Sequence, residues 1–193
     1  DDKDIAGVKM PQDSMVRLMK GPKGSKVRIT VRRGGTLIPF DIIRDKIPVN
    51  CVDASFMLND TTGYIKLSKF TRTTYKEFTE AAESLVDKGM TRLIFDLRDN
   101  SGGYFDQSWK LANEFLERGD EVVYMEGLHR PRQNFDADGR GSLKNVLLSV
   151  LIDEGTASSS EIFSGAIQDN DRGVIVGRRS FGKGLVQEPV NFT

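Results

Sequence analysis

The chain has 193 residues, of which 38% are hydrophobic and 29% are charged, enough for one ordinary domain or for a small domain joined to a larger one. Its 28 basic and 28 acidic residues cancel, which argues against nucleic acid and anionic membranes as partners. The single cysteine, Cys51, excludes an internal disulfide, and the single histidine, His129, argues against a zinc site built on His or Cys clusters. We therefore expect no metal site.

Residues 1–46 are predicted to form a small unit. Apolar residues within 15–19 give a short helical pattern, which ends at Gly21-Pro22. Residues 26–31 alternate with period two, and the turn at 33–36 returns the chain into a second apolar strand, which predicts a β-hairpin. Basic residues along this segment are expected to lie on a solvated strand face, with a binding patch as the alternative. Residues 45–48 are predicted to be a linker.

Residues 47–193 are predicted to form a larger α/β domain. Strand patterns occupy residues 51–58, 63–67, 91–99, 121–126, 145–153 and 173–177. Helix patterns occupy residues 74–86, 109–116 and 160–169. Because strands alternate with helices, we predict a mostly parallel sheet flanked by helices and covered on both faces.

Three local features of this domain are also predicted. Thr74 and Glu77 have the spacing of a capping box at the start of the first helix. Residues 129–143 are polar and contain glycine, which indicates a long loop. Residues 184–192 carry strand-forming residues and are expected to extend as a strand.

The stretch GRRSFGKG, residues 177–184, nearly matches the phosphate-binding loop G-x-x-x-x-G-K-[ST]. A phosphate loop must lead into a helix, whereas the residues that follow here resemble a strand. Gly184 also stands where that loop places its Mg²⁺-binding Ser or Thr. A nucleotide hydrolase therefore stays only as an alternative. Lys183 is either a turn lysine in water or a buried amine that loses its proton and acts as a general base.

A base requires a nucleophile, and the segment DEGTASSSEIFSG, residues 153–165, offers serines where a buried strand turns into a helix. A serine there is exposed at the carboxyl end of a strand, beside helix amides that stabilise an oxyanion. The alternative is that these serines only cap the helix. The residues alone do not choose among Ser158, Ser159 and Ser160. His129 is a poor base candidate because it lies in the polar segment HRPRQ.

The segment DNSGG, residues 99–103, follows another buried strand. Its two glycines allow a backbone N–H group to point at a substrate carbonyl, although a simple strand-to-helix turn explains them equally well. Ligands of open α/β sheets bind at the carboxyl ends of strands. We therefore expect this segment and the serine segment to share a cleft.

Three motifs, LIFDLRDNSGG, DEGTASSSEIFSGAIQDNDRGVIVG and SFGKGLVQ, occur in this order over residues 93–187 and resemble the C-terminal processing peptidases, also called tail-specific proteases. These are serine endopeptidases with a Ser/Lys dyad. The segment LMKGPKGSKVRITVRRGG resembles the second half of that family's PDZ domain, so the similarity extends over nearly the whole chain. The resemblance implies a crotonase/ClpP-like peptidase core and no cofactor.

Carried over by position, the resemblance implies Ser158 as the nucleophile, Lys183 as the general base and Gln187 as the residue that orients the lysine. It also implies that the backbone amides of Gly102 and Ser159 donate to the oxyanion.

The resemblance further implies protein or peptide substrates with apolar C-termini, and an extracytoplasmic location in the periplasm or at the cell surface. A homo-oligomer or an adaptor protein is a further possible partner. A second interpretation is a non-catalytic, PDZ-containing module that binds or scaffolds peptides. The PDZ-like unit lacks its first half and the chain stops at Thr193, so we expect both ends to be trimmed.

Overall fold

The structure is a computed structural model that describes residues 5–45 and 50–187. The chain forms two compact units, Asp1–Val49 and Asn50–Thr193. The domain boundary predicted between residues 46 and 47 lies outside the described residues, as do residues 188–192 of the strand predicted near the end.

The first unit contains the predicted helix and hairpin. Helix α1 covers Gln12–Met19, strand β1 covers Lys26–Arg33 and strand β2 covers Thr36–Ile43. The two strands pair antiparallel through a two-residue turn at Gly34 and Gly35, whose φ angles are 54° and 85°. A two-residue turn of this kind needs positive φ at both positions, which explains the glycine pair.

Arginine side chains tie the first unit together. Arg28 pairs with Asp41, directly opposite on β2, through Nε–Oδ1 and Nη2–Oδ2 distances of 2.7 and 2.9 Å. Arg44 donates to the carbonyl oxygen of Met19 at 2.7 Å and to Ser25 Oγ at 3.0 Å, so it connects the end of α1 to the hairpin. None of the described residues of this unit is buried, and it therefore has no apolar core of its own.

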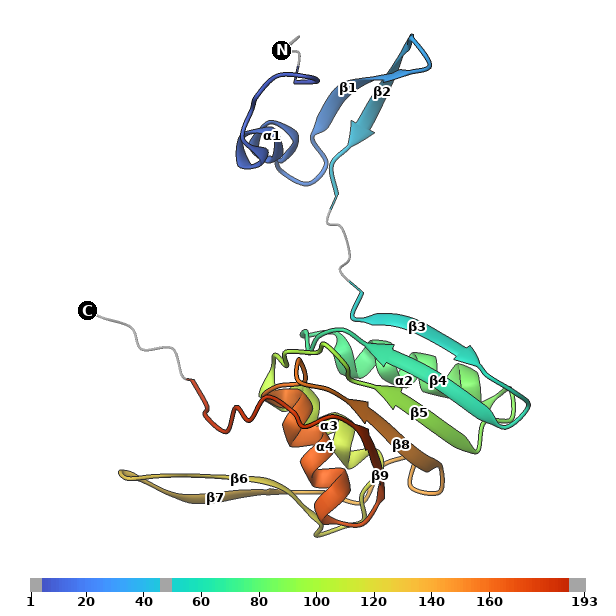
Figure 1. The fold of residues 1–193 in the computed structure, drawn as a ribbon, viewed down its shortest axis with the longest axis vertical. Helices are drawn as coiled ribbons and strands as arrows, with labels where there is room; N and C mark the ends of the chain where they lie inside the picture. Colours follow the sequence, from blue (N-terminus) through green and yellow to red (C-terminus); the bar gives the residue numbers. More distant parts are fainter. Residues whose placement is uncertain (1–4, 46–49, 188–193) are drawn as a thin grey trace. The chain divides into compact units, whose positions relative to one another are not determined.

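The second unit contains three helices and seven strands among its described residues (Figure 1). They are β3 (Val52–Met57), β4 (Thr62–Leu67), α2 (Thr74–Val86), β5 (Arg92–Asp96), α3 (Phe105–Asn113), β6 (Glu121–Gly127), β7 (Arg130–Asp136), β8 (Leu147–Ile152), α4 (Ser159–Asp169) and β9 (Gly173–Gly177).

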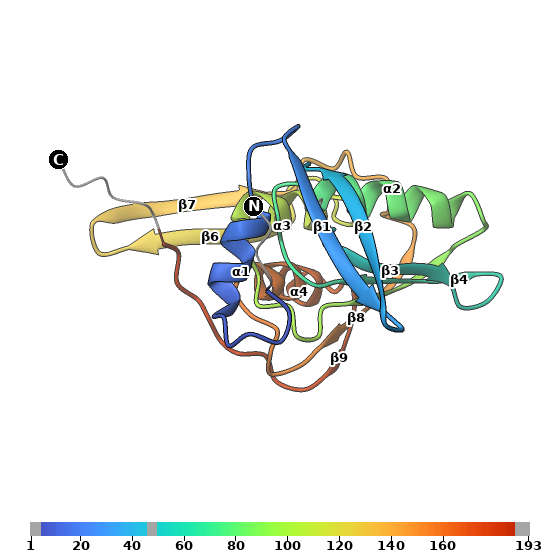
Figure 2. The same ribbon diagram turned by 90° about the horizontal axis from the view of Figure 1, so that it is seen from above.

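Five strands form one sheet in the order β3-β4-β5-β8-β9, antiparallel between β3 and β4 and parallel elsewhere. The predicted α/β fold with a mostly parallel sheet is confirmed. The predicted cover on both faces is wrong for the described residues, because α2, α3 and α4 lie on the same face (Figure 2). On the other face Leu147 and Val174 are 64% and 61% exposed.

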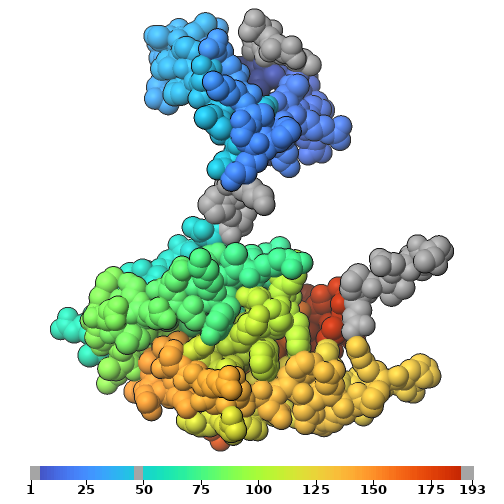
Figure 3. Space-filling view, turned by 180° about the vertical axis from the view of Figure 1, so that it is seen from behind, coloured from blue at the N-terminus to red at the C-terminus, as the bar shows by residue number. Residues whose placement is uncertain are grey.

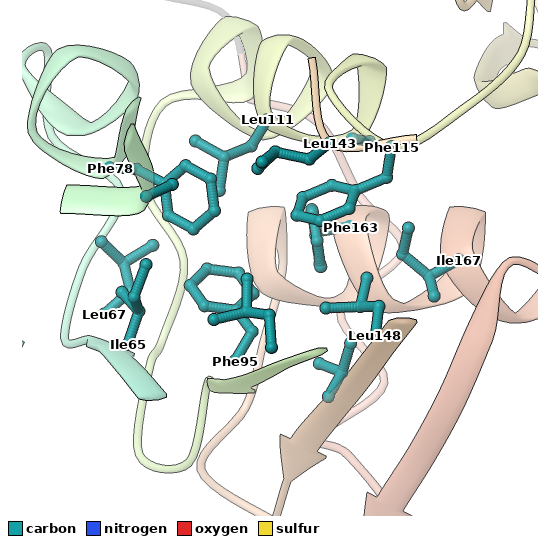
Figure 4. Close-up of a cluster of buried hydrophobic side chains, with 14 of the residues drawn as sticks. Ile65, Leu67, Phe78, Phe95, Leu111, Phe115, Leu143, Leu148, Phe163 and Ile167 are labelled. Carbon is teal, nitrogen blue, oxygen red and sulfur yellow. The ribbon is translucent and has the colours of Figure 1, made fainter. Parts of the chain in front are cut away.

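The core lies between this sheet and its three helices (Figure 4). Phe95 of β5 packs edge-on against Phe78 of α2 and Phe163 of α4, with ring centroids 5.1 and 5.0 Å apart. Phe115, just after α3, completes the aromatic cluster at 5.8 Å from Phe163. The cluster fixes α4, and hence its amino end, against the middle of the sheet.

Residues 130–136, predicted to lie in a loop, form strand β7, which pairs with β6 in a hairpin. Figure 3 shows this hairpin, in yellow, standing out from the surface of the second unit. Its strand β7 is almost entirely exposed, so it has no buried face and hence no alternation of apolar and polar residues to signal a strand. Leu128, in the turn, is 94% exposed.

The predicted capping box of Thr74 and Glu77 is also wrong. Helix α2 is capped at Thr73, whose hydroxyl donates to Glu77 Oε1 at 2.7 Å. Glu77 Oε2 instead accepts the amides of Cys51 and Val52, at 2.7 and 3.3 Å. The Glu77 carboxylate therefore accepts the backbone N–H groups at the start of β3. These residues lie 25 or more positions away from Glu77 in the sequence.

No helix among the described residues is both long and apolar enough to cross a bilayer.

We expect Phe163→Ala to lower the free energy of unfolding by about 3–5 kcal/mol, because the ring is fully buried and its loss leaves a cavity. Urea unfolding followed by far-UV circular dichroism measures the change. Leu128→Ala is the control and should change stability by less than about 0.5 kcal/mol. Similar losses for both variants would contradict the described core.

Candidate active site

Ser158 lies between β8 and α4 in a backbone conformation that few non-glycine residues adopt. Its φ is 57° and its ψ is −116°. Positive φ costs energy in an L-residue because the side chain crowds the backbone. Strain of this kind tends to occur at functional sites, where the surrounding structure enforces it. The conformation therefore indicates a role for Ser158 beyond capping the helix.

The structure separates the three candidate serines. Ser159 and Ser160 are buried, and their hydroxyls donate to the carbonyl oxygens of Gly103 and Asn100, both at 2.9 Å. The Ser158 hydroxyl donates to no atom of the described residues, and Ser158 lines a cavity. The Ser158 side chain accepts the amide of Glu161 in the capping box of α4, so among the three serines only Ser158 has a hydroxyl that donates to no described atom.

The turn after β5 and the turn before α4 are joined through Asn100, which is completely buried. Its carbonyl oxygen accepts the amide of Ala157 at 3.0 Å and the hydroxyl of Ser160 at 2.9 Å. Its Nδ2 donates to the carbonyl oxygen of Leu67, at the end of β4, at 2.8 Å. Asn100 thus connects the end of β4 and the turn after β5 to the serine-containing turn between β8 and α4.

Gly102 brings the two turns into direct contact. A Cβ atom at this position would lie 2.8 Å from Ser158 Cβ and 2.6 Å from the carbonyl oxygen of Ala157, and the φ of Gly102 is 91°. Only glycine fits this position. The DNSGG segment and the serine segment therefore adjoin, as expected from their places at the carboxyl ends of parallel strands.

The amide of Gly102, which the resemblance assigns to the oxyanion, already has a partner. It donates to Asn100 Oδ1 at 2.9 Å, and both residues are buried. The N–H group therefore points into the fold in this structure.

The neighbouring amide of Gly103 has the opposite orientation. Phe70 donates its amide to Gly102 O and accepts the amide of Tyr104, at 3.0 and 2.9 Å, so both groups face Phe70. Along an extended chain the N–H and C=O of the residue between them face the other way. There Gly103 O meets the Ser159 hydroxyl. The amides of Gly103 and Ser159 have no partner among the described residues.

Lys183 lies in an irregular segment, and the strand predicted for residues 184–192 is wrong for its described part, residues 184–187. The carboxylate of Glu161, in the first turn of α4, holds this segment. Glu161 Oε1 accepts the amide of Gly182 at 2.6 Å, and Oε2 accepts the amides of Lys183 and Ser158 at 2.9 and 2.7 Å. One carboxylate thus connects the backbones of the candidate base and the candidate nucleophile.

Burial raises the pKa of the Glu161 carboxyl, but hydrogen bonds from the Ser180 hydroxyl and from the amides of Lys183, Gly182 and Ser158 outweigh it and hold the pKa below its usual range. The carboxylate form therefore holds the segment at neutral pH.

The two candidate residues of the dyad line one cavity of about 660 Å³. Its walls come from α4, from β6 and from residues 182–184. Lys183 is exposed, so of the two alternatives for this residue the structure agrees with the turn lysine in water and not with the buried amine.

The remaining candidates lie apart from this cavity. Gln187 is exposed in the irregular segment and has no hydrogen bond to a described residue. His129 is exposed in the turn of the β6–β7 hairpin, whose tip projects away from the helices (Figure 1). The described residues contain no group of three or more His, Cys, Asp or Glu residues placed to hold a metal ion.

Comparison with known proteins identifies the family. The model of peptidase family S41 matches residues 61–193, more than half of the chain. The chain belongs to peptidase family S41.

Proteins similar to this S41 chain carry consistent names. It is 34% identical over 183 residues to a probable CtpA-like serine protease of Staphylococcus saprophyticus, covering 94% of this chain and 37% of that protein. It is 37% identical over 182 residues to a carboxyl-terminal-processing protease of Synechocystis sp., covering 91% of this chain and 42% of that protein. The chain thus spans about two fifths of each relative.

Among solved structures, the photosystem II D1 C-terminal processing protease is similar with a TM-score of 0.66 and 30% identity, over 87% of this chain and 47% of that one. The similar proteins are proteases by name, which supports a protease role for the S41 chain.

Reasoning from the sequence missed two residues of the S41 site, Glu161 and Asn100. Glu161 carried a detectable signal, because Ser158 and Glu161 have the S-x-x-E spacing of a capping box. The hydrogen bonds from Gly182 and Lys183 to Glu161 left no signal in the sequence, because they join residues that are 21 and 22 positions apart.

We expect Glu161→Gln to speed amide hydrogen exchange at Gly182 and Lys183 by roughly 10- to 100-fold at pH 7, because hydrogen bonds to a charged acceptor are lost. Exchange followed by NMR measures this. Glu80→Gln, on the exposed side of α2, is the control and should leave both rates unchanged.

The pH dependence has a definite sign. The folded pKa of Glu161 lies below the usual value, so the stabilisation is complete above about pH 4.3 and is lost as the pH falls through the folded pKa. The amide shifts of Gly182 and Lys183 should therefore titrate only below that pH. Titration near neutral pH would contradict the proposed role of Glu161.

Proposed function

We propose that this chain carries the catalytic centre of a serine endopeptidase of the C-terminal processing type. One observation carries the proposal: Ser158, on a strained turn and with its hydroxyl donated to no described atom, lines the same cavity as Lys183 in a chain of peptidase family S41. The names of the similar proteins agree with this reaction.

In the proposed reaction, the neutral amine of Lys183 takes the proton of Ser158 Oγ, and the oxygen bonds to the carbonyl carbon of a peptide. The C–N bond then breaks, and the proton passes to the leaving amine. A water molecule, deprotonated by Lys183, attacks the resulting ester and releases the acid and Ser158. No cofactor takes part.

The exposed position of Lys183 sets a requirement for this chemistry. An ammonium in water keeps its proton, so Lys183 must lose solvent before it acts as a base. We propose that the bound substrate, or further chain that packs over residues 178–187, supplies this cover. Gln187, which lies in the same segment, is proposed to orient the amine once the cover is in place.

For the oxyanion we propose the amides of Ser159 and Gly103. The amide of Ser159 lies at the first turn of α4, where the helix dipole also favours negative charge. We propose Gly103 in place of Gly102 because the Gly103 N–H has no described partner and lies on the side of the chain where the Gly103 carbonyl oxygen accepts the Ser159 hydroxyl, whereas the N–H of Gly102 is bonded to Asn100.

The substrate class follows the same proposal. We propose that the protein cleaves proteins near apolar C-terminal tails outside the cytoplasm, and that residues 1–46 are part of a PDZ domain that holds the tail. The helix followed by a hairpin in the first unit is compatible with this. A homo-oligomer or an adaptor protein as further partner also belongs to the proposal.

Two other functions are less well supported. A nucleotide-binding loop would lead into a helix, but residues 184–187 are irregular and Gly184 replaces the Mg²⁺ ligand. A non-catalytic peptide-binding module would use the first unit alone. That function does not explain the strained backbone of Ser158.

We expect Ser158→Ala and Lys183→Ala each to lower kcat/KM on an unfolded protein substrate by about 10⁴-fold or more, because each removes an essential partner in acyl transfer. A fluorophosphonate probe should label Ser158 in the unmodified chain and not in either variant. Ser84→Ala and Lys76→Ala, at exposed positions of α2, are the controls. Unchanged cleavage in Ser158→Ala, with the fold intact by circular dichroism, would refute the proposal and favour the binding module.

A further inference from the structure

One face of α4 forms a wall of the cavity and runs from Ser158 to the end of the helix. Its cavity-lining residues recur at helical spacing, with the small or apolar Ile162, Gly165 and Ala166 between polar residues at the two ends, Glu161 at one and Asp169 and Asn170 at the other. Since Ser158 lies at one end of this face, an extended peptide attacked by its hydroxyl can lie along the wall.

The packing of the fold does not explain why glycine occupies position 165 on this wall. A Cβ atom at Gly165 would meet no atom within 4 Å, and its φ is not positive. Glycine in a helix interior is less stable than alanine, so the local structure favours a side chain here. By contrast, a Cβ at Gly173, just after the helix, would lie 2.8 Å from Leu148 O. The absence of a side chain at Gly165 serves to keep the cavity open.

The opposite wall is strand β6, which contributes Val123 and Tyr124. Asn170, at the end of α4, donates from Nδ2 to the carbonyl oxygen of Glu121 at 2.9 Å and fixes the strand against the helix. The groove beside Gly165 is therefore bounded by aliphatic and aromatic surface and held at a defined width, as ligand clefts generally are.

The position of Gly165 along the groove follows from element geometry. Seven residues of α-helix separate it from Ser158, about 10 Å at 1.5 Å per residue. An extended peptide advances about 3.3 Å per residue. Gly165 therefore faces a substrate residue about three positions from the attacked carbonyl.

We propose that Gly165 is a specificity-determining residue that admits a bulky apolar substrate side chain about three residues from the cleaved bond. The inference rests on the proposed peptidase function and adds to it a position and a size class for substrate selection. The groove and the proposed substrate side chain are compatible, because the groove is apolar at this point and transfer of an apolar side chain from water into it is favourable.

The test compares peptides that carry Ala, Leu or Phe at each of the four positions on either side of one cleavage site. We expect the unmodified chain to prefer Leu or Phe over Ala by roughly 10- to 30-fold in kcat/KM at a position about three residues from the bond. Gly165→Leu should remove that preference while the Ala peptide keeps its rate within about threefold. Gly165→Ala should fold normally and have an intermediate effect.

Ser84→Leu is the control, because Ser84 is exposed on helix α2 and does not line this cavity. It should keep the profile of the unmodified chain. An unchanged profile in Gly165→Leu, or an equal loss for Ala, Leu and Phe peptides, would overturn the inference.

A binding measurement separates this inference from the proposed function. Fluorescence anisotropy of the same labelled peptides with Ser158→Ala, with and without Gly165→Leu, reports the size preference when no bond is cleaved. If the unmodified chain cleaves no peptide, the proposed function fails, and the anisotropy profile still decides the role of Gly165.

Discussion

The arrangement of the site depends on one carboxylate that accepts three backbone amides. Glu161 holds the amide of Ser158 on one side and those of Gly182 and Lys183 on the other. Each bond is between a charged acceptor and a neutral donor, and such bonds are stronger than neutral ones. These hydrogen bonds from Gly182 and Lys183 to Glu161 connect the segment that contains Lys183 to the first turn of α4.

The sheet supplies the second constraint, because β5 and β8 are adjacent and parallel. The turns that follow these strands therefore emerge at the same edge, one with Gly102 and one with Ser158. Asn100 links the two turns through its backbone and, through its side chain, the end of β4. Groups from distant parts of the sequence thus meet because of strand order alone, as ligand sites of open α/β sheets generally do.

Much of this could be predicted from the sequence where one face of an element is buried. Residues 160–169 and 91–99 carry strong apolar patterns, and the structure forms α4 there and β5 over Arg92–Asp96. Strand β7 escaped prediction because an exposed hairpin has no apolar face. The hydrogen bond between Glu77 and Cys51 joins residues 26 positions apart, so it depends on the folded structure and not on a local pattern. The bond from the Gly102 amide to Asn100 Oδ1 is a local turn that asparagine favours, and the expectation for Gly102 overlooked it.

The backbone of Ser158 connects stability with function at a single position. A positive φ in a non-glycine residue costs energy, and the surrounding hydrogen bonds hold Ser158 in that conformation. Replacing its whole side chain with a hydrogen atom, as in glycine, relieves the crowding but removes the hydroxyl that the proposed reaction requires. Under the proposed function, selection for stability and selection for turnover therefore act in opposite directions at this residue.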